Sequence, residues 1–340
     1  MSSVRIKDIA KALELSSATV SMVFNNKPGV NSDTRARVLS YADQVGYRTS
    51  QAQRSSLTEA RSIRFIVYKK NGRIVSDTPF FAELIEGIES EAKRDHFGLA
   101  ISYISESNPQ AEIMRMVSDN AQDGIIILAT EMEADDIRKF RGANLPIVML
   151  DSYFELEQFD TVVINNVQSA MIATKYLTDC GHTKIGHLKS SVPINNFAER
   201  EAGFMRALTY ADFRYNDEYT ITLSPSIDGA YSDMLSKLKE KKSLPTAFFA
   251  DNDIIAFGAM KAMKESGINI PQDIYIIGFD DMPFSTLIEP NLTTVRVYKD
   301  RIGTLAVKRI MERIRGEAKE RVKIEVGADL VIRDSVADIR

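Results

Sequence analysis

The first fifty residues contain three short stretches in which apolar positions recur at helical spacing. In the first stretch the apolar positions stand at i, i+3, i+4 and i+7, as Ile6, Ile9, Ala10 and Leu13. Ser16 is a suitable N-cap for a second helix over residues 17–25. A turn-rich loop at 26–29 precedes a third helix, which Asn31 caps and which ends at Gly46. Two short helices joined by a tight turn and closed by a third predict a helix-turn-helix unit.

From residue 63 onward the pattern changes to short β-branched runs that alternate with amphipathic helices. The strands expected are Arg64–Tyr68, Leu99–Ile104, Gly124–Ala129 and Ile147–Asp151, then Lys184–Lys189, Tyr219–Leu223, Ala247–Ala250 and Tyr275–Phe279. Consecutive strands start about 22 to 36 residues apart, as βαβ units require. Two series predict two lobes, each a parallel sheet with helices on both faces. A tail remains, with a segment at Leu292–Tyr298, a helix at Arg301–Ile314 and strands at Val322–Val326 and Asp329–Ile332.

Composition and charge agree with a small head on a larger body. The 340 residues suggest about two folding units, and 44% hydrophobic with 26% charged residues argues against disorder. The net charge is −4, but residues 1–61 hold nine Lys or Arg against five Asp or Glu, a net of +4 that leaves −8 for the rest. A basic head on an acidic body predicts that only the head meets a polyanion. A small interaction bundle that binds no nucleic acid is the alternative for the head.

The cysteine count and the first residues indicate a compartment. A single cysteine, Cys180, excludes a disulfide within the chain and fits a reducing environment. Charged side chains among the first twenty residues interrupt any signal-peptide core, and no later stretch offers the ~18 uninterrupted apolar residues of a membrane span. We therefore expect a soluble cytoplasmic protein with no membrane partner.

Several motifs occur together in the order found in one known family. They are Ile6-Lys7-Asp8-Ile9-Ala10, Ala18-Thr19-Val20-Ser21, Phe24-Asn25 and Thr34-Arg35 through Gly46-Tyr47. The chain resembles the LacI/GalR family of bacterial repressors, and the resemblance continues through nearly its whole length. It implies an all-α helix-turn-helix head and an α/β body of two doubly wound parallel-sheet lobes, of the type I periplasmic-binding-protein kind. The implied boundaries are 1–47 for the head, 48–61 for a hinge, 62–161 with 293–320 for the first lobe, and 162–292 with 321–340 for the second.

The resemblance also implies the residues that contact DNA. Bases or flanking phosphates would face Ser16, Ser17, Ala18, Ser21 and Met22, while Thr19, Asn25, Thr34 and Tyr47 would mostly hold the DNA backbone. Met22 stands where the family often has a longer polar reader such as arginine, so a bidentate guanine contact is not available there. Thr49 replaces a usual proline, and Leu57 lies one residue beyond the place of the family's minor-groove leucine. Either a re-registered hinge helix makes Leu57 the wedge, or the DNA is kinked less.

A ligand site is expected outside the carboxyl ends of the strands, between the lobes. The contacts implied by position are Phe80, Phe81, Asp151, Asn165, Arg200, Asp253 and Asp280. Carboxylates accept hydroxyl protons and a guanidinium donates in a fixed fork, so the acidic residues and Arg200 suit a hydroxylated ligand. Asn165 stands where the family usually has aspartate. Alternatives remain open for three positions, since Asp253 could cap a helix, Asp280 could belong to a hinge and Phe80 could be core.

The residue mix around this site favours a sugar over a purine as the ligand. Flat faces are expected from Phe81, Tyr153 and Phe197, and further hydrogen-bonding groups from Asn195 and Asn196. No phosphate loop, dinucleotide motif or nucleophile elbow occurs in the chain. The histidines lack metal-site spacing, and Cys180 is better explained as a packed thiol. We therefore expect no enzyme activity, no metal and no cofactor.

These observations together predict a sequence-specific DNA-binding transcription regulator, a repressor whose operator affinity is set by a small-molecule effector bound between the lobes. The resemblance implies a homodimer formed through the helices Phe81–His96 and Gln110–Asn120. No heptad of leucines follows the last expected strand, which favours a dimer over a tetramer. The alternative is a solute-binding protein or sensor without DNA binding, for which a basic head has no purpose and a signal peptide is lacking.

Overall fold

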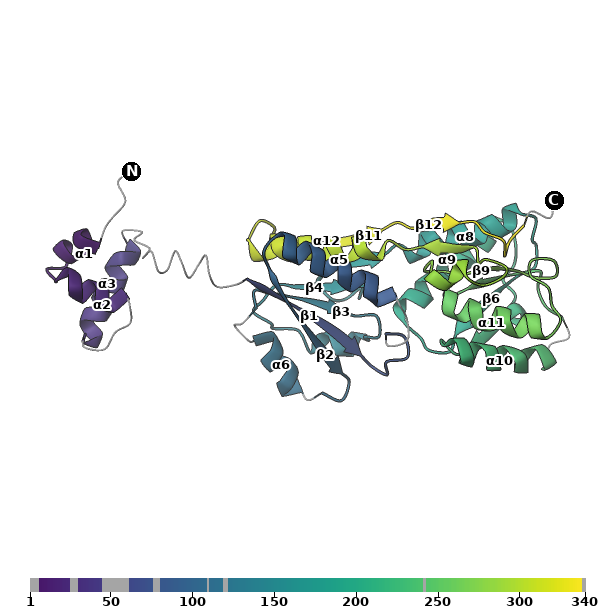
Figure 1. The fold of residues 1–340 in the computed structure, drawn as a ribbon, viewed down its shortest axis with the longest axis horizontal. Helices are drawn as coiled ribbons and strands as arrows, with labels where there is room; N and C mark the ends of the chain where they lie inside the picture. Colours follow the sequence, from purple (N-terminus) through teal and green to yellow (C-terminus); the bar gives the residue numbers. More distant parts are fainter. Residues whose placement is uncertain are drawn as a thin grey trace. The chain divides into compact units, whose positions relative to one another are not determined.

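The computed structural model describes residues 6–24, 30–44, 61–75, 80–108, 110–118, 122–240 and 243–337. The chain divides into two compact units, Met1–Ala60 and Arg61–Arg340 (Figure 1). Each unit has an apolar interior of its own. Among the described residues, no helix combines the length and the apolar character that crossing a membrane requires.

The head consists of three helices packed on a small apolar core. They are α1 (Ile6–Ala12), α2 (Ser17–Phe24) and α3 (Ser32–Gln44). Ile9, Val20 and Val38, one from each helix, are fully buried against one another. Ser16 Oγ accepts the backbone N–H of Thr19 at 2.9 Å, and Asn31 Oδ1 accepts that of Thr34 at 2.7 Å. The predicted three-helix head and both predicted N-caps are confirmed.

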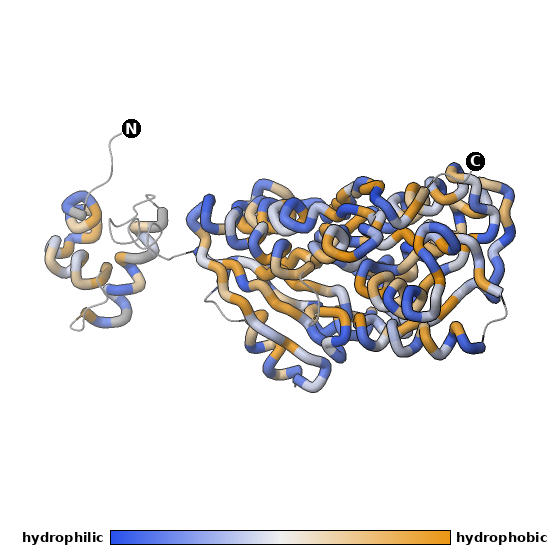
Figure 2. The backbone as a smooth tube through the Cα atoms, turned by 45° about the vertical axis from the view of Figure 1, so that its right-hand side comes forward, coloured by the Kyte–Doolittle hydropathy of each residue, from blue (hydrophilic) through white to orange (hydrophobic). Residues whose placement is uncertain are grey.

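The first lobe is built on a six-stranded parallel sheet in the order β11-β5-β4-β3-β1-β2. Its strands are β1 (Ser62–Lys69), β2 (Gly98–Ser105), β3 (Gly124–Leu128), β4 (Ile147–Leu150), β5 (Asp160–Ile164) and β11 (Lys323–Val326). The helices of this lobe are α5 (Phe80–Arg94), α6 (Gln110–Ser118), α7 (Ala134–Arg138) and α12 (Lys299–Ile314). Strands β3 and β4 are buried along their whole length, as central strands of a parallel sheet should be. Figure 2 shows the resulting hydrophobic segments running through the body between hydrophilic ones.

The second lobe has a four-stranded parallel sheet in the order β7-β6-β8-β9. Its strands are β6 (Ile185–Ser190), β7 (Thr220–Leu223), β8 (Ala247–Ala250) and β9 (Tyr275–Ile277). Its helices are α8 (Asn166–Asp179), α9 (Asn195–Tyr210), α10 (Ile227–Glu240) and α11 (Asp253–Glu265), with short 3-10 turns at Asp217–Tyr219 and Pro283–Thr286. Helix α8 packs on α9 and α10 on α11, and Figure 1 shows the two pairs on opposite sides of the strands.

Three segments of the chain cross between the lobes. The first crossing lies at Asn165, between β5 and α8. The second is at 297–298, between β10 (Thr294–Arg296) and α12, and the third is at 327–328, between β11 and β12 (Asp329–Val331). Strands β10 and β12 pair antiparallel, and bridges align the chain around β10 with the end of β9. The two lobes are therefore connected by three segments of the chain.

The strand pairing corrects the expected lobe boundaries in three places. The expected boundary at 161/162 falls inside β5. The sequence pattern does not predict this strand, because no helix separates it from β4 as βαβ spacing requires. Residues 321–340 were assigned to the second lobe, yet β11 pairs with β5 in the first sheet. Residues 293–320 were assigned to the first lobe, yet β10 lies along the end of β9.

Helices α5 and α12 approach each other closely and so fix the start of α12 beside the lobe boundary. A Cβ on Gly87 would stand 2.2 Å from the carbonyl oxygen of Asp300. A Cβ on Gly303 would stand 2.4 Å from the carbonyl oxygen of Leu84. Only glycine permits backbones this close, so the pair holds Phe80 and Lys299, the first residues of the two helices, at the same end of the lobe.

Candidate functional site

The second helix of the head has one buried and one exposed side, as a reading helix needs. Val20 and Val23 are buried, whereas Ser17 and Ala18 are exposed. The remaining predicted contacts on this helix, Thr19, Ser21 and Met22, are partly exposed, as is Thr34 on α3. Ser16 is exposed, and its hydroxyl already caps α2 and lies 2.8 Å from Thr19 Oγ1. The predictions for Asn25, Tyr47 and Leu57 lie outside the described residues.

Arg200 on α9 is the centre of the hydrogen bonding between strand ends in the body. Its Nε donates to Asn166 Oδ1 at 2.9 Å, and its Nη1 donates to the Asp251 carbonyl at 2.5 Å. Its Nη2 donates to Asp280 Oδ1 at 3.2 Å, while Cζ lies 3.7 Å from the ring centroid of Phe279. The side chain is only 3% exposed. The protein thus supplies acceptors for three N–H groups of Arg200, a residue that was expected to donate to a ligand.

Asp280 and Asp281 follow β9 in a strained conformation that sends their carboxylates to different partners. Both have positive φ, 108° and 48°, a region that non-glycine residues rarely adopt. Asp280 pairs with Arg200, while Asp281 accepts from Arg296 at 2.7 Å and from Arg333 at 2.5 Å. Burial raises the pKa of Asp280, opposed by the charges of Arg200 and Lys299. Asp281 therefore links the segments around β10 and β12, whereas the carboxylate of Asp280 interacts with Arg200 and with the charge of Lys299.

Asp151 directly follows β4 of the first lobe and is joined to the second lobe by a hydrogen bond. Its Oδ2 accepts from Thr130 Oγ1 at 2.6 Å, and its Oδ1 accepts from Asn196 Nδ2 on α9 at 3.1 Å. The side chain is 2% exposed, and burial raises its pKa to about 6. The Thr130 hydrogen bond and the charge of Arg200 both act in the opposite direction. Asp151 and Arg200 are thus electrostatically coupled across the lobe boundary.

Asp253 is completely buried and holds the segment that follows β9. Its Oδ2 accepts from the backbone N–H of Met282 at 2.7 Å and from Ser285 Oγ at 2.8 Å, and its Oδ1 accepts from Thr294 Oγ1 at 2.5 Å. Burial, followed by the charge of Asp280, raises its pKa to about 7. The N-cap of α11 is Asn252, which accepts the N–H of Ile255 at 3.0 Å, so the open alternative that Asp253 caps this helix is wrong.

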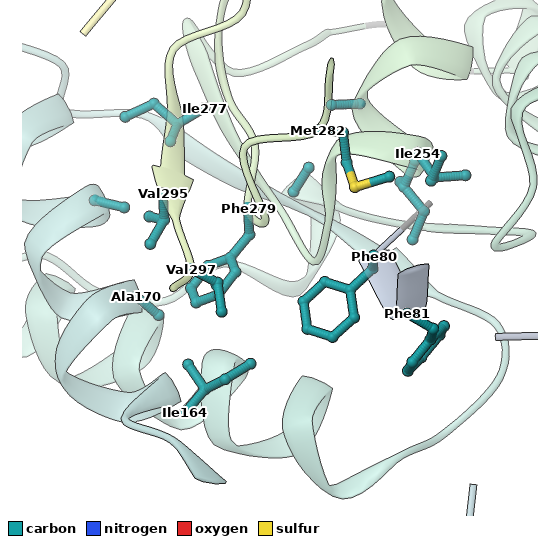
Figure 3. Packing of buried hydrophobic residues seen from close by; sticks show 14 of the residues in the cluster. Phe80, Phe81, Ile164, Ala170, Ile254, Ile277, Phe279, Met282, Val295 and Val297 are labelled. Atoms are coloured by element: carbon teal, nitrogen blue, oxygen red, sulfur yellow. The ribbon is translucent and has the colours of Figure 1, made fainter. Parts of the chain in front are cut away.

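The two phenylalanines at the start of α5 are buried in an apolar cluster. Phe80 and Phe81 are 6% and 7% exposed, and their rings meet edge to face at 5.1 Å. Figure 3 shows Phe80 of the first lobe beside Phe279 and Val297, with Ile254 and Met282 beyond it. Phe80 is therefore core, as the alternative allowed, and it is core shared between the lobes.

Lys299, which the sequence reasoning missed, adds a second buried cation at the lobe boundary. It is the first residue of α12, and its side chain is 3% exposed. Its Nζ lies 3.4 Å from Glu83 Oε2 and 5.7 Å from the ring centroid of Phe80, and its charge lowers the pKa of Asp280. The only sequence signal was a lysine at a helix start directly after an apolar crossing segment. Asp151, Arg200, Asp280 and Lys299 together form what we call the interlobe charge cluster.

The remaining expected contacts lie around this cluster or away from it. Asn165 caps α8 by accepting the N–H of Gln168 at 3.2 Å, and it is the neighbouring Asn166 that contacts Arg200. Asn195 Nδ2 donates to the carbonyl of Tyr153 at 3.1 Å. Asn195 and Tyr153 line a crevice of about 470 Å³. Asn196 and Thr130 reach the cluster through Asp151, a link that no local sequence pattern signals.

The raised pKa of Asp151 predicts how the stability of the body changes with pH. Because the folded pKa of about 6 exceeds the unfolded value, its contribution is present in acid and is lost as the pH rises from about 4 to about 6. Two pH units correspond to about 3 kcal/mol of unfolding free energy. Urea unfolding between pH 4 and pH 7.5 is expected to show a shallower decline in Asp151→Asn than in the wild type. Equal slopes in the two proteins would contradict the assignment.

A helical head and a two-lobed α/β body with buried charges between its lobes define the class of ligand-responsive DNA-binding regulators. The family model "Bacterial regulatory proteins, lacI family" matches residues 5–50, and the model "Periplasmic binding protein-like domain" matches residues 174–336. The HTH-type transcriptional repressor PurR of Pasteurella multocida is 31% identical over 335 residues, which cover 97% of this chain and 98% of that protein. The chain belongs to the lacI family of bacterial regulatory proteins, and the predicted class, a DNA-binding transcription regulator, is confirmed.

Two solved structures share the fold over most of the chain. A LacI family transcriptional regulator from Enterococcus faecium with bound ribose is 26% identical, with a TM-score of 0.69, and covers 82% of this chain and 100% of its own. The lac repressor dimer bound to operator and the anti-inducer ONPF is 23% identical, with a TM-score of 0.70, and covers 98% of this chain and 99% of its own. The alternative of a solute-binding protein without DNA binding is not supported, because the repressor relative matches head and body together.

Proposed function

We propose that this protein is a transcriptional repressor that binds an operator through residues 1–47 and a small sugar between the lobes of its body. The observation that carries the proposal is the interlobe charge cluster, which belongs to the same chain as a helix-turn-helix head. A ligand that changes the spacing of Asp151 and Arg200 changes the lobe arrangement. The lobe arrangement in turn sets operator affinity through the hinge at 48–61. A difference of about 1.4 kcal/mol between the two states changes operator affinity tenfold.

The chemistry of the cluster supports a sugar as the effector. Carboxylates such as those of Asp151 and Asp280 can accept hydroxyl protons, and the N–H groups of Arg200 and Lys299 can donate to hydroxyl oxygens. A sugar hydroxyl satisfies both kinds of group, because it donates and accepts. The related regulator with bound ribose gives independent support for this ligand class.

The DNA-bound form proposed here is a homodimer. Its interface consists of the first-lobe helices within Phe81–His96 and Gln110–Asn120, and two heads then reach successive half-sites of a near-palindromic operator. The structure of the lac repressor dimer on its operator supports this arrangement. A protein that acts on operator DNA works in the cytoplasm, and we propose that it catalyses no reaction. Whether Leu57 is the minor-groove wedge stays a prediction, which DNA bending by Leu57→Ala tests.

Calorimetry separates a sugar effector from a purine effector. We expect measurable heat from at least one member of a panel of pentoses, hexoses and disaccharides, and none from adenine, guanine or hypoxanthine. Arg206→Met, an exposed change on the same helix as Arg200, is the control and is expected to retain the sugar affinity. Heat from a purine base alone would overturn the sugar assignment while leaving a repressor with an interlobe effector intact.

A further inference from the structure

A small apolar cluster, separate from the main cores, joins the two lobes. Ile74, in the loop after β1 of the first lobe, packs against Val192 and Phe197 of the second lobe, with Ile194 beside them. Ile74, Val192 and Phe197 are 6%, 8% and 6% exposed. Each belongs to a loop or to the first turn of a helix, so their burial depends on the two lobes lying together. Separating the lobes would expose this apolar surface to water, which is unfavourable.

The loop that carries Ile74 is held in shape by one buried carboxylate. Glu131, in the turn that follows β3, is 5% exposed and accepts five backbone N–H groups. Its Oε2 accepts from Lys70, Asn71 and Gly72 at 2.9, 3.1 and 2.9 Å, and its Oε1 accepts from Ile74 and Val75 at 2.8 and 3.0 Å. Burial alone would raise the pKa of Glu131, but these N–H groups hold it below its usual range. The loop therefore has a fixed form that presents Ile74 to the other lobe.

The residue before Glu131 supports a second contact to the same turn of α9. Thr130 Oγ1 donates to Asp151, which in turn accepts from Asn196. Thr130 is thus linked to Asn196 through Asp151, and the next residue, Glu131, is linked to the next residue of α9, Phe197, through Ile74. Arg200 lies one helical turn further along α9, and its Cζ is 5.6 Å from the ring centroid of Phe197. A shift of the first turn of α9 against the first lobe therefore moves Arg200 as well.

We propose that Ile74, presented by Glu131, is a latch that holds the lobes in the arrangement seen here and couples their separation to the position of Arg200. The latch consists of Ile74 and Glu131 on the first lobe and of Val192, Ile194 and Phe197 on the second. It acts without a ligand, because every contact in it is made by the protein. The latch thus favours this lobe arrangement over a separated one before any effector binds, and an effector shifts that equilibrium in one direction or the other.

Distance measurements between spin labels test the latch in the ligand-free full chain. Nitroxide labels on Asp135→Cys in α7 and Ser232→Cys in α10, both exposed and both outside the helices proposed for the dimer interface, report lobe separation in a Cys180→Ser background that lacks the native thiol. Ile74→Ala is expected to add a longer-distance population at the expense of the original one. Ile74→Val, which keeps most of the apolar contact, is expected to restore the original distribution.

Two further variants make the test decisive. Glu131→Gln is expected to act like Ile74→Ala, because an amide nitrogen facing backbone N–H groups cannot hold the loop. Ile113→Ala, at a fully buried position in the core of the first lobe alone, is the matched control and is expected to leave the distances unchanged. Unchanged distances in folded Ile74→Ala and Glu131→Gln, or an equal lengthening in Ile113→Ala, would overturn the latch. Failure of every sugar to bind would leave this result untouched, so the latch and the effector assignment fail separately.

Discussion

Replacing Arg200 with methionine is expected to lower the unfolding free energy of the body by about 3–5 kcal/mol, the cost of removing one partner of a buried ion pair. The substitution leaves the carboxylate of Asp280, which is 8% exposed in the wild type, without its ion-pair partner and with only the nearby charge of Lys299. It also leaves Asn166 Oδ1 and the Asp251 carbonyl without the donors that they now have. Methionine keeps much of the apolar contact with Phe279 but supplies no N–H group.

Urea unfolding of the wild type and three variants measures this effect. The double variant Arg200→Met with Asp280→Asn is expected to recover a large part of the loss, because it removes the uncompensated buried charge. Arg206→Met makes the same chemical change at an exposed position of the same helix and is expected to stay within about 0.5 kcal/mol of the wild type. A loss in Arg200→Met no larger than in Arg206→Met would contradict the role given to the interlobe charge cluster.

Replacing Val20 with aspartate in the head is expected to weaken operator binding by roughly 10³-fold or more, down to the nonspecific level. Val20 is completely buried between Ile9 and Val38, and an unpaired carboxylate there costs more than so small a core can offset. The body is a separate compact unit, so its stability and ligand binding are expected to remain unchanged.

A gel-shift or fluorescence titration on a duplex that the wild-type protein selects from a random pool measures this loss. Ala36→Asp, at an exposed position of α3, adds the same charge to the head without disturbing its core, and is expected to keep the affinity within about tenfold. Specific binding that survives Val20→Asp would show that the folded head is not what reads the operator.

The helices of the head and most strands of the body could be predicted because their patterns are local. Ser16 and Asn31 precede apolar periodic stretches and act as caps, as expected. Strand β5 escaped prediction because the connection from β4 holds no helix, so the spacing rule for βαβ units did not apply. Strand β11 could not be assigned to a sheet from sequence, since its partner β5 lies about 160 residues earlier in the chain.

The sequence pattern predicts those residues of the candidate site that follow directly after strands, because the ends of strands can be located from sequence. Asp151, Arg200 and Asp280 do meet at the lobe boundary, while Asn165 is a helix cap and its neighbour Asn166 makes the contact. Asp253 turned out to order the chain after β9, which depends on hydrogen bonds to residues about 30 to 40 positions away. Lys299 was missed because its burial arises from the close packing of α12 on α5, and a lysine at a helix start is usually exposed.

The most direct test of the account measures operator affinity with and without the sugar identified by calorimetry, for the full chain and for the body alone, residues 61–340. The account predicts that the full chain binds the selected duplex, that the sugar changes its affinity at least tenfold, and that the body binds the sugar but not the duplex. Tight sequence-selective binding of DNA by the body, or an operator affinity of the full chain that the bound sugar leaves unchanged, would contradict it.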